Sequence, residues 1–372
     1  MRQSRVQRRS RAQKAGIAAL VATALLTVAA CGSGSGGAAE EFPSRITFVV
    51  PFEAGGGTDT WARILAPKLE KVLPGSPSIR VENLPSGKGI PANNEFYNRA
   101  KDDGSRILVG TSSSYNPYLL HQKGVEYDFA KLRPVVAMGT GSVIYASKAS
   151  GIKSIQDMIG RSTPAKYGAI NQTGADLGAL VAFEMLGIHV DATFGFEGRG
   201  PISLAFQRGE LDVDRQTTSA YISTVQPLVD KGEVVPLATY GVIDEKGEIV
   251  RDPNFPDLPT VAEVYEQIKG SAPSGPAWDA YKVFAVAGYT YQKTLWATPG
   301  TPDSILDAYT DAVKQLQNDE EFMKKLHEEA GDYPLVAGDT NRDVIQRSFT
   351  VTDEAGKFVS NLLAEKYDTQ LD

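Results

Sequence analysis

The sequence predicts an α/β protein of two lobes, each a mostly parallel sheet flanked by helices, with two crossing strands between them. Short apolar, β-branched runs alternate with helical patterns along the chain, and this order produces parallel sheets. The alternation occurs in two series, and an apolar run follows each series. The length of 372 residues also suits two domains better than one.

The first series begins with residues 46–50 (ITFVV), an apolar and β-branched run that predicts a buried strand. Thr58 can cap a helix to about residue 72, because apolar residues from Trp61 to Leu69 recur at helical spacing. The series continues with a strand at 79–82, a helix at 93–100 and a strand at 106–110. Residues 135–147 are mostly apolar or small and predict a long strand that crosses to the second lobe.

The second series starts after this crossing. We expect strands at 166–170, 193–196, 211–213 and 234–239, and helices at 175–186, 201–208 and 220–230. Residues 281–287 (YKVFAVA) predict a second crossing strand. Helices follow at 302–317, 319–329 and 342–364. The expected organisation is a first lobe of residues 43–140 plus 285–372 and a second lobe of residues 141–284.

The first thirty residues predict an export signal. Six basic residues and no acidic one precede residue 15, and residues 15–30 form an uncharged apolar run too short to span a bilayer comfortably. The run ends in Val28-Ala29-Ala30-Cys31, which resembles the lipobox of bacterial lipoproteins. In that class the signal is cut before the cysteine and the thiol is diacylated, which implies lipidation at Cys31 and an extracytoplasmic protein anchored to the cell membrane. The alternative is a plain secretory signal, and residues 31–42 predict a flexible tether.

Composition narrows the classes of function. Hydrophobic residues make up 42% of the chain and charged residues 22%, the balance of a globular rather than a disordered protein. A single cysteine excludes a disulfide framework, and three scattered histidines argue against a histidine metal centre. The net charge is −7, and it becomes −13 without the basic first thirty residues, which argues against a nucleic-acid partner. We expect no metal and no cofactor.

The most informative segment is residues 51–63, PFEAGGGTDTWAR. A strand ends here, three glycines allow close approach to the backbone, and a helix begins. The first amide groups of a helix are unpaired and lie at the positive end of its dipole, so the segment can cradle a carboxylate or a phosphate. It is not a Walker loop, because no Gly-Lys-Ser/Thr follows, and it does not fit G-x-G-x-x-G. The alternative is a plain strand–helix turn capped by Asp59.

This loop resembles the signature loop of the tripartite tricarboxylate transporter substrate-binding proteins, also called Bug-type receptors. Further segments resemble the family in chain order: 81–96, 102–117, 194–213, 255–264 and 297–331. The resemblance implies a type II-like periplasmic-binding-protein clamshell that captures a small organic carboxylate between its lobes. It also implies delivery of that ligand to multi-spanning membrane permease subunits. We expect a monomer that is not an enzyme.

Ligand contacts are implied in four loops. The first loop comprises Phe52, Ala54, Gly55, Gly56, Gly57, Thr58 and Asp59, whose main-chain groups would hold a carboxylate. The second comprises Ser112, Ser113, Ser114 and Asn116, with a solvent-exposed serine turn as the alternative. The second lobe would contribute Gln172, Thr173 and Gly174, and Gly198, Arg199 and Gly200. Within the first loop, we expect Asp59 to brace the chain or cap the helix rather than to touch an anion.

Three charged side chains leave the ligand open. Arg199 could pair with a ligand carboxylate, with Glu197 or with solvent, and Arg63 could form a structural salt bridge or contact the ligand. Glu53 stands where the family has a small residue, and an acid that faced the cradle would repel a second carboxylate. A monocarboxylate, an amino acid or a zwitterion therefore remains possible. Two other functions stay open: a sensing protein of the same fold with a signalling partner, and a secreted enzyme acting on small carboxylates.

Overall fold

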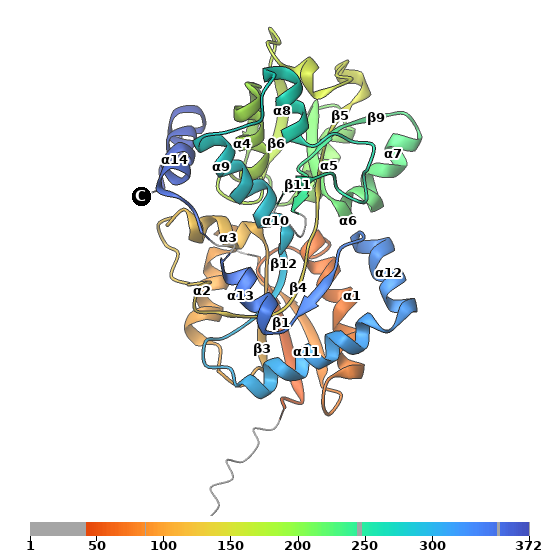
Figure 1. The fold of residues 1–372 in the computed structure, drawn as a ribbon, viewed down its shortest axis with the longest axis vertical. Helices are drawn as coiled ribbons and strands as arrows, with labels where there is room; N and C mark the ends of the chain where they lie inside the picture. Colours follow the sequence, from red (N-terminus) through yellow and green to blue (C-terminus); the bar gives the residue numbers. More distant parts are fainter. Residues whose placement is uncertain (1–41, 86, 244–247, 348–349, 372) are drawn as a thin grey trace, which may run out of the picture. The chain divides into compact units, whose positions relative to one another are not determined.

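The computed structural model describes residues 42–85, 87–243, 248–347 and 350–371, which all belong to one compact unit spanning residues 40–372. Within these ranges the strands form a six-stranded sheet, a five-stranded sheet and a small two-stranded sheet (Figure 1). The small sheet pairs β10 (Val242–Ile243) with β11 (Ile249–Val250). The predicted lipidation at Cys31 and the predicted signal segment lie outside the described residues.

The first sheet has the strand order β13-β4-β12-β3-β1-β2. Its strands are β1 (Arg45–Val50), β2 (Ser78–Asn83), β3 (Arg106–Gly110), β4 (Arg133–Met138), β12 (Lys293–Ala297) and β13 (Leu335–Ala337). β1 pairs in parallel with β2 and β3, whereas β12 pairs antiparallel with β3 and β4. The helices on this sheet are α1 (Gly57–Val72), α2 (Ile90–Arg99), α3 (Ser112–Leu119), α11 (Asp303–Gln317), α12 (Glu320–Ala330) and α13 (Asp339–Arg347). Trp61, Leu65 and Leu69 bury the predicted apolar face of α1.

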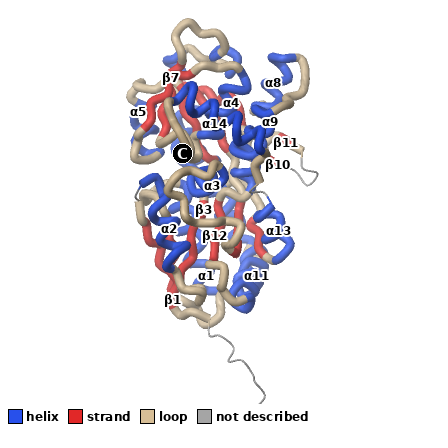
Figure 2. The backbone as a smooth tube through the Cα atoms, turned by 90° about the vertical axis from the view of Figure 1, so that its left-hand side faces the viewer, coloured by secondary structure: helices blue, strands red, loops and turns tan. Residues whose placement is uncertain are grey.

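The second sheet has the order β7-β6-β8-β5-β9. Its strands are β5 (Ser142–Ser147), β6 (Ala165–Ala169), β7 (Val190–Phe194), β8 (Val213–Thr217) and β9 (Val234–Thr239). The neighbouring helices are α4 (Leu177–Leu186), α5 (Arg199–Gln207), α6 (Thr218–Ala220), α7 (Gln226–Asp230), α8 (Val261–Lys269) and α9 (Pro276–Tyr281). Helices flank both sheets (Figure 2), which confirms the predicted α/β class. Both sheets are mixed rather than mostly parallel, because β12, β13 and β5 pair antiparallel with their neighbours.

The two crossings between the sheets differ in kind. The predicted strand at 135–147 is present as β4 and β5, which lie in different sheets and are separated by residues 139–141. The predicted strand at 281–287 is wrong, because these residues continue α9 as a helix into α10 (Gly288–Thr290). Phe284 and Val286 are buried in the core under the second sheet. Most of this short segment is apolar and Lys282 is its one exposed residue, so periodicity alone cannot distinguish its sequence from that of a buried strand.

Three further elements differ from the predictions. The strand expected at 211–213 is β8, which runs to Thr217, and the polar segment expected as a loop at 111–116 forms the start of α3. The helix expected at 342–364 is two helices, α13 and α14 (Asp353–Tyr367). Helix α14 packs on α9 and adds Val359 to the core of the second sheet, although residues 285–372 were expected in the first lobe.

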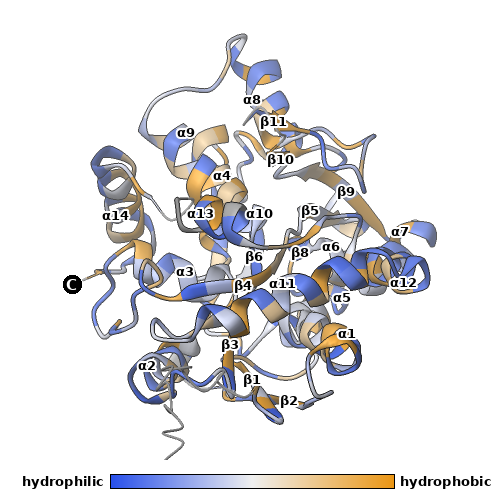
Figure 3. Ribbon diagram, turned by 60° about the horizontal axis from the view of Figure 1, so that its bottom comes forward, coloured by the Kyte–Doolittle hydropathy of each residue, from blue (hydrophilic) through white to orange (hydrophobic). Residues whose placement is uncertain are grey.

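The distribution of apolar and polar residues matches this arrangement of sheets and helices. Apolar residues concentrate on the strands and on the inward faces of the helices, and the outer faces of α11 and α12 are polar (Figure 3). Over the described ranges, no helix combines the length and the apolar character that crossing a bilayer requires.

Candidate functional site

The glycine loop lies at the carboxyl end of β1 and leads directly into α1. Gly55 has a φ of +81°, a left-handed conformation that favours glycine. The buried Asp59 side chain accepts a 2.8 Å hydrogen bond from the Gly55 amide and a 2.9 Å bond from Arg63 Nε. Burial raises the pKa of Asp59, but hydrogen bonds from Arg63 and Gly55 outweigh this and hold it below its ordinary value. Asp59 therefore braces the loop, and Arg63 forms a structural salt bridge.

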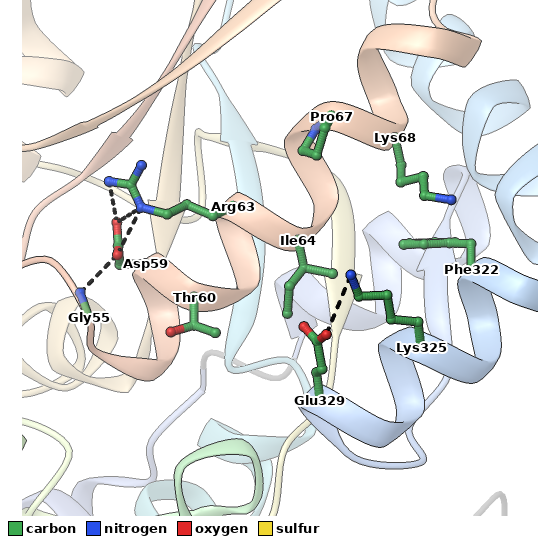
Figure 4. A pocket seen from close by; sticks show the side chains of 10 residues that line it. All are labelled: Gly55, Asp59, Thr60, Arg63, Ile64, Pro67, Lys68, Phe322, Lys325 and Glu329. Atoms are coloured by element: carbon green, nitrogen blue, oxygen red, sulfur yellow. Dashed lines mark hydrogen bonds and ion pairs between the residues drawn. The ribbon is translucent and has the colours of Figure 1, made fainter. Parts of the chain in front are cut away.

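Beside this loop, a hollow of about 500 Å³ separates α1 from α12 (Figure 4). All three cations among its lining residues are paired. Arg63 pairs with Asp59, Lys68 with Asp319 at 3.5 Å, and Lys325 with Glu329 at 3.6 Å. The hollow therefore has no strong surplus of positive charge with which to attract an anion.

The first turn of α1 faces the second sheet on another side. A Cβ atom added to Gly57 would lie 3.2 Å from Thr217 Oγ1, 3.4 Å from Ser219 Oγ and 3.7 Å from Lys293 Nζ. Thr217 ends β8 and Ser219 lies in α6, so both come from the second sheet and its following helix. Lys293 begins β12 of the first sheet. Helix N-terminus, two hydroxyls and an ammonium group thus converge on one point between the sheets.

Lys293 is the most unusual of these groups. Its residue is only 1% exposed, and Nζ donates hydrogen bonds of 3.1 Å to the Gly57 carbonyl and to Ser219 Oγ. In the part of the chain that the structure describes, no carboxylate pairs with it within 4.0 Å. Burial lowers the pKa of Lys293 to about 7. A buried ammonium with only neutral partners is poorly compensated, which is why its proton is held weakly.

The predicted serine loop lies at the start of α3 and faces other parts of the molecule rather than solvent. Ser112 Oγ donates to the Gly288 carbonyl at 2.9 Å, and Asn116 Nδ2 donates to the Gly174 carbonyl at 2.8 Å. Ser113 Oγ accepts a 3.2 Å bond from the Ala175 amide. Among the described residues, the buried Ser114 Oγ and Asn116 Oδ1 have no hydrogen-bond partner. The structure thus joins the second and third predicted loops across the two sheets.

Hydrogen bonds within the loop stabilise the third predicted segment, residues 172–174. Asn171 Oδ1 accepts the amide hydrogens of Thr173 at 3.1 Å and Gly174 at 2.5 Å, and Thr173 Oγ1 donates to Gln122 Oε1 at 2.8 Å. Gln172 is half-buried beside them. Several of the polar groups that were expected to bind a ligand are therefore already used in hydrogen bonds within the protein.

Arg199 begins α5 and belongs to a buried ion cluster. Its Nη1 pairs with Asp176 at 3.0 Å, and its Nη2 contacts Asp214 and the Arg215 carbonyl. Arg215 also pairs with Asp176, at 2.9 Å, so two arginines balance two aspartates. Burial raises the pKa of Asp176, but Arg215 and Arg199 outweigh this and keep it below its ordinary value. The partners of Arg199 are thus Asp176 and Asp214, which sequence reasoning did not connect with it.

The fourth predicted loop surrounds this arginine. No atom lies within 4 Å of a Cβ placed on Gly198 or Gly200, so both positions have open space beside them. The loop leaves room for a ligand, but the guanidinium of Arg199 is already paired.

A sequence model of the tripartite tricarboxylate transporter family receptors (TctC) matches residues 61–348. The chain belongs to this receptor family. The match begins just after the glycine loop, so the loop itself lies outside the matched residues. A UPF0065 protein of Bordetella pertussis is 28% identical over 314 residues, which cover 82% of this chain and 86% of the relative.

Solved structures share the fold of this TctC-family receptor. Rpa4515 of Rhodopseudomonas palustris with adipate has a TM-score of 0.65 at 22% identity and covers 87% of this chain and 98% of its own. MatC of the same organism with bound malate has a TM-score of 0.62 at 20% identity, and the coverages are 86% and 98%. At sequence identities of 20% and 22%, these similarities establish a shared fold only.

Sequence reasoning missed three residues that meet at the α1 N-terminus of the receptor: Thr217, Ser219 and Lys293. Two signals could have found them. The polar run Gln216-Thr217-Thr218-Ser219 lies at the carboxyl end of a buried strand, where α/β proteins place ligand contacts. Lys293 is a charged residue that opens the strand KTLWA, and a charge buried in a strand indicates a specific partner.

Proposed function

We propose that this protein is an extracytoplasmic receptor that captures a small organic carboxylate between its two sheets and delivers it to a membrane permease. One observation carries the proposal: the first turn of α1 meets Thr217, Ser219 and Lys293 at Gly57. The opening amides of α1 lack intrahelical acceptors and lie at the positive end of the helix dipole. Together these groups suit an anion with several acceptor oxygens.

A receptor that closes around its ligand requires binding groups from both sheets. A ligand can shift the balance between open and closed forms only if it binds the closed form more tightly. A carboxylate at Gly57 would contact α1 of the first sheet and the β8–α6 junction of the second at once. The adipate and malate of the two R. palustris structures support this ligand class, and the family description supports a permease as the partner.

The proposed location depends on Cys31. Diacylation there, followed by the tether of residues 31–42, would hold the receptor at the membrane surface near its permease. Because a single chain can contact both the ligand and the permease, we propose that it acts as a monomer.

A thermal-shift screen tests the ligand class. Purified receptor is heated with mono-, di- and tricarboxylates, aromatic acids and amino acids, with glucose as the neutral control. A carboxylate at one hundred times its dissociation constant should add about 2.7 kcal/mol to the free energy of unfolding and raise the melting temperature. Stabilisation by glucose without stabilisation by any carboxylate would contradict the proposal.

A further inference from the structure

We propose that Lys293 is the cation that pairs with the ligand carboxylate, and that Thr217 and Ser219 donate hydroxyl hydrogen bonds to the same group. This inference rests on the proposed function and adds the charge that selects the ligand. The glycine loop offers only backbone dipoles, whereas Lys293 offers a full charge at the same place.

Charge balance singles out this lysine. The other largely buried cations of the described residues are matched: Arg199 and Arg215 pair with Asp176, and Arg342 pairs with Asp339. Lys293 is as buried as Arg215 but hydrogen-bonds only a carbonyl and a hydroxyl. Burying an ammonium without a counter-ion costs several kcal/mol, and a carboxylate beside it would recover much of that cost.

Hydrogen-bonding capacity leaves room for this carboxylate. An ammonium has three N–H donors, and Nζ uses two of them on the Gly57 carbonyl and Ser219 Oγ, each at 3.1 Å. Ser219 Oγ accepts from the lysine, so its own hydrogen remains available to an acceptor. Thr217 Oγ1 lies on the same side, 3.2 Å from a Cβ placed on Gly57. Three donors from two sheets therefore converge beside Gly57, where the 3.2 Å spacing requires the sheets to part slightly before a carboxylate enters.

Two carboxylates on neighbouring elements already have partners, and Glu53 of the glycine loop is exposed to solvent. Asp59 of α1 binds Arg63 and the Gly55 amide. Asp252, buried near the start of α6, accepts hydrogen bonds from Tyr333 and Asn254, and Tyr333 also bonds to Thr218. On the adjacent strand β4, Lys293 is paired with the apolar Met138. A carboxylate from outside the described chain is thus the partner that the site lacks.

Proton uptake on binding follows from this arrangement. Burial lowers the pKa of Lys293 to about 7, so near neutral pH the free receptor holds this side chain charged in only part of the population. A bound carboxylate favours the charged form and raises the pKa. Binding near pH 7 should therefore take up about half a proton, and affinity should fall as the pH rises above about 7.

Isothermal titration calorimetry tests the inference with the best-stabilising carboxylate of the screen. Wild-type receptor is titrated at pH 6 to 9 in buffers of different ionisation enthalpy, which measures proton uptake without any variant. Lys293→Met keeps the length of the side chain and removes its charge. We expect a loss of affinity between about tenfold and a hundredfold, the range for a hydrogen bond to a charged group, and a flat pH profile. Lys324→Met, on the exposed face of α12, is the matched control and should bind as the wild type does.

The outcomes separate the two proposals. Wild-type binding with no proton uptake, or Lys293→Met with unchanged affinity and pH profile, overturns the role of Lys293 and leaves the receptor function standing. Failure of the wild type to bind any carboxylate overturns both. If Lys293→Met does not fold, the proton uptake of the wild type decides alone. Lys293→Arg, which keeps the charge, should retain more affinity than Lys293→Met.

Discussion

Removal of the Asp59 carboxylate tests the brace of the glycine loop. Asp59 is 3% exposed and holds the Gly55 amide at 2.8 Å, while Arg63 secures the carboxylate from the other side at 2.9 Å. Asp59→Ala removes both contacts without leaving a buried charge, because half of the Arg63 side chain is exposed. The change therefore reports on the brace rather than on an uncompensated ion.

The expected magnitude follows from these two contacts. A hydrogen bond from an amide to a charged group contributes about 1.5–3 kcal/mol, and a pair with a half-exposed arginine adds at most about 1 kcal/mol. We expect Asp59→Ala to lower the free energy of unfolding by about 2–3 kcal/mol. Asp59→Asn keeps an acceptor for Gly55 and should cost about half as much. Ligand affinity should also fall about fivefold, because the loop must be ordered again at each binding event.

The pH dependence gives an independent check. The folded pKa of Asp59 lies below its ordinary value of 3.8, so its contribution is complete above that value and is lost as the pH falls through the folded pKa. Urea denaturation of wild type and Asp59→Ala at pH 7 and pH 3 measures the difference. The difference in the free energy of unfolding between wild type and Asp59→Ala should be smaller at pH 3 than at pH 7.

A matched control separates the brace from general surface charge. Asp311→Ala removes an exposed carboxylate from α11, whose partner Lys314 lies one turn away, and should change stability by less than about 0.5 kcal/mol. Equal stability and equal ligand affinity of wild type and Asp59→Ala would refute the structural role assigned to this residue.

Two further changes test the site and the location. Gly57→Val should abolish carboxylate binding while leaving the receptor folded, because its Cβ would stand 3.2 Å from Thr217 Oγ1, and its methyl groups would fill the space assigned to the ligand. Gly356→Ala, a helical glycine with room for a Cβ, is the calorimetric control, and retained affinity in Gly57→Val would contradict the site. Cys31→Ser should move the protein from the membrane fraction to the soluble extracytoplasmic fraction on cell fractionation, because it removes the acyl anchor. Unchanged membrane association would count against lipidation.

The fold could be predicted wherever a pattern was local. The glycine loop and the apolar face of α1 follow from residues within one turn of each other, and the structure has a helix from Gly57 to Val72. The prediction failed at 281–287, a short and mostly apolar run in which Lys282 alone is exposed, so the pattern shows no polar face that would mark a helix. It also failed at α3, whose serines suggested a loop although buried hydrogen bonds hold them in a helix.

The candidate site could likewise be predicted only where its features depend on residues that are close in the sequence. Sequence patterns and family resemblance located a helix N-terminus with close backbone access, because helix starts and glycine conformation depend on neighbouring residues. The expected cap at Thr58 is wrong, since the helix begins at Gly57 and Gly56 is its N-cap. Arg199 could not be assigned in this way, since its carboxylate partners lie 15 and 23 residues away. Lys293 meets the Gly57 carbonyl from 236 residues further along the chain. Burial and charge compensation are properties of the packed chain, so only the tertiary structure could single out this lysine as a buried cation with no counter-ion among the described residues.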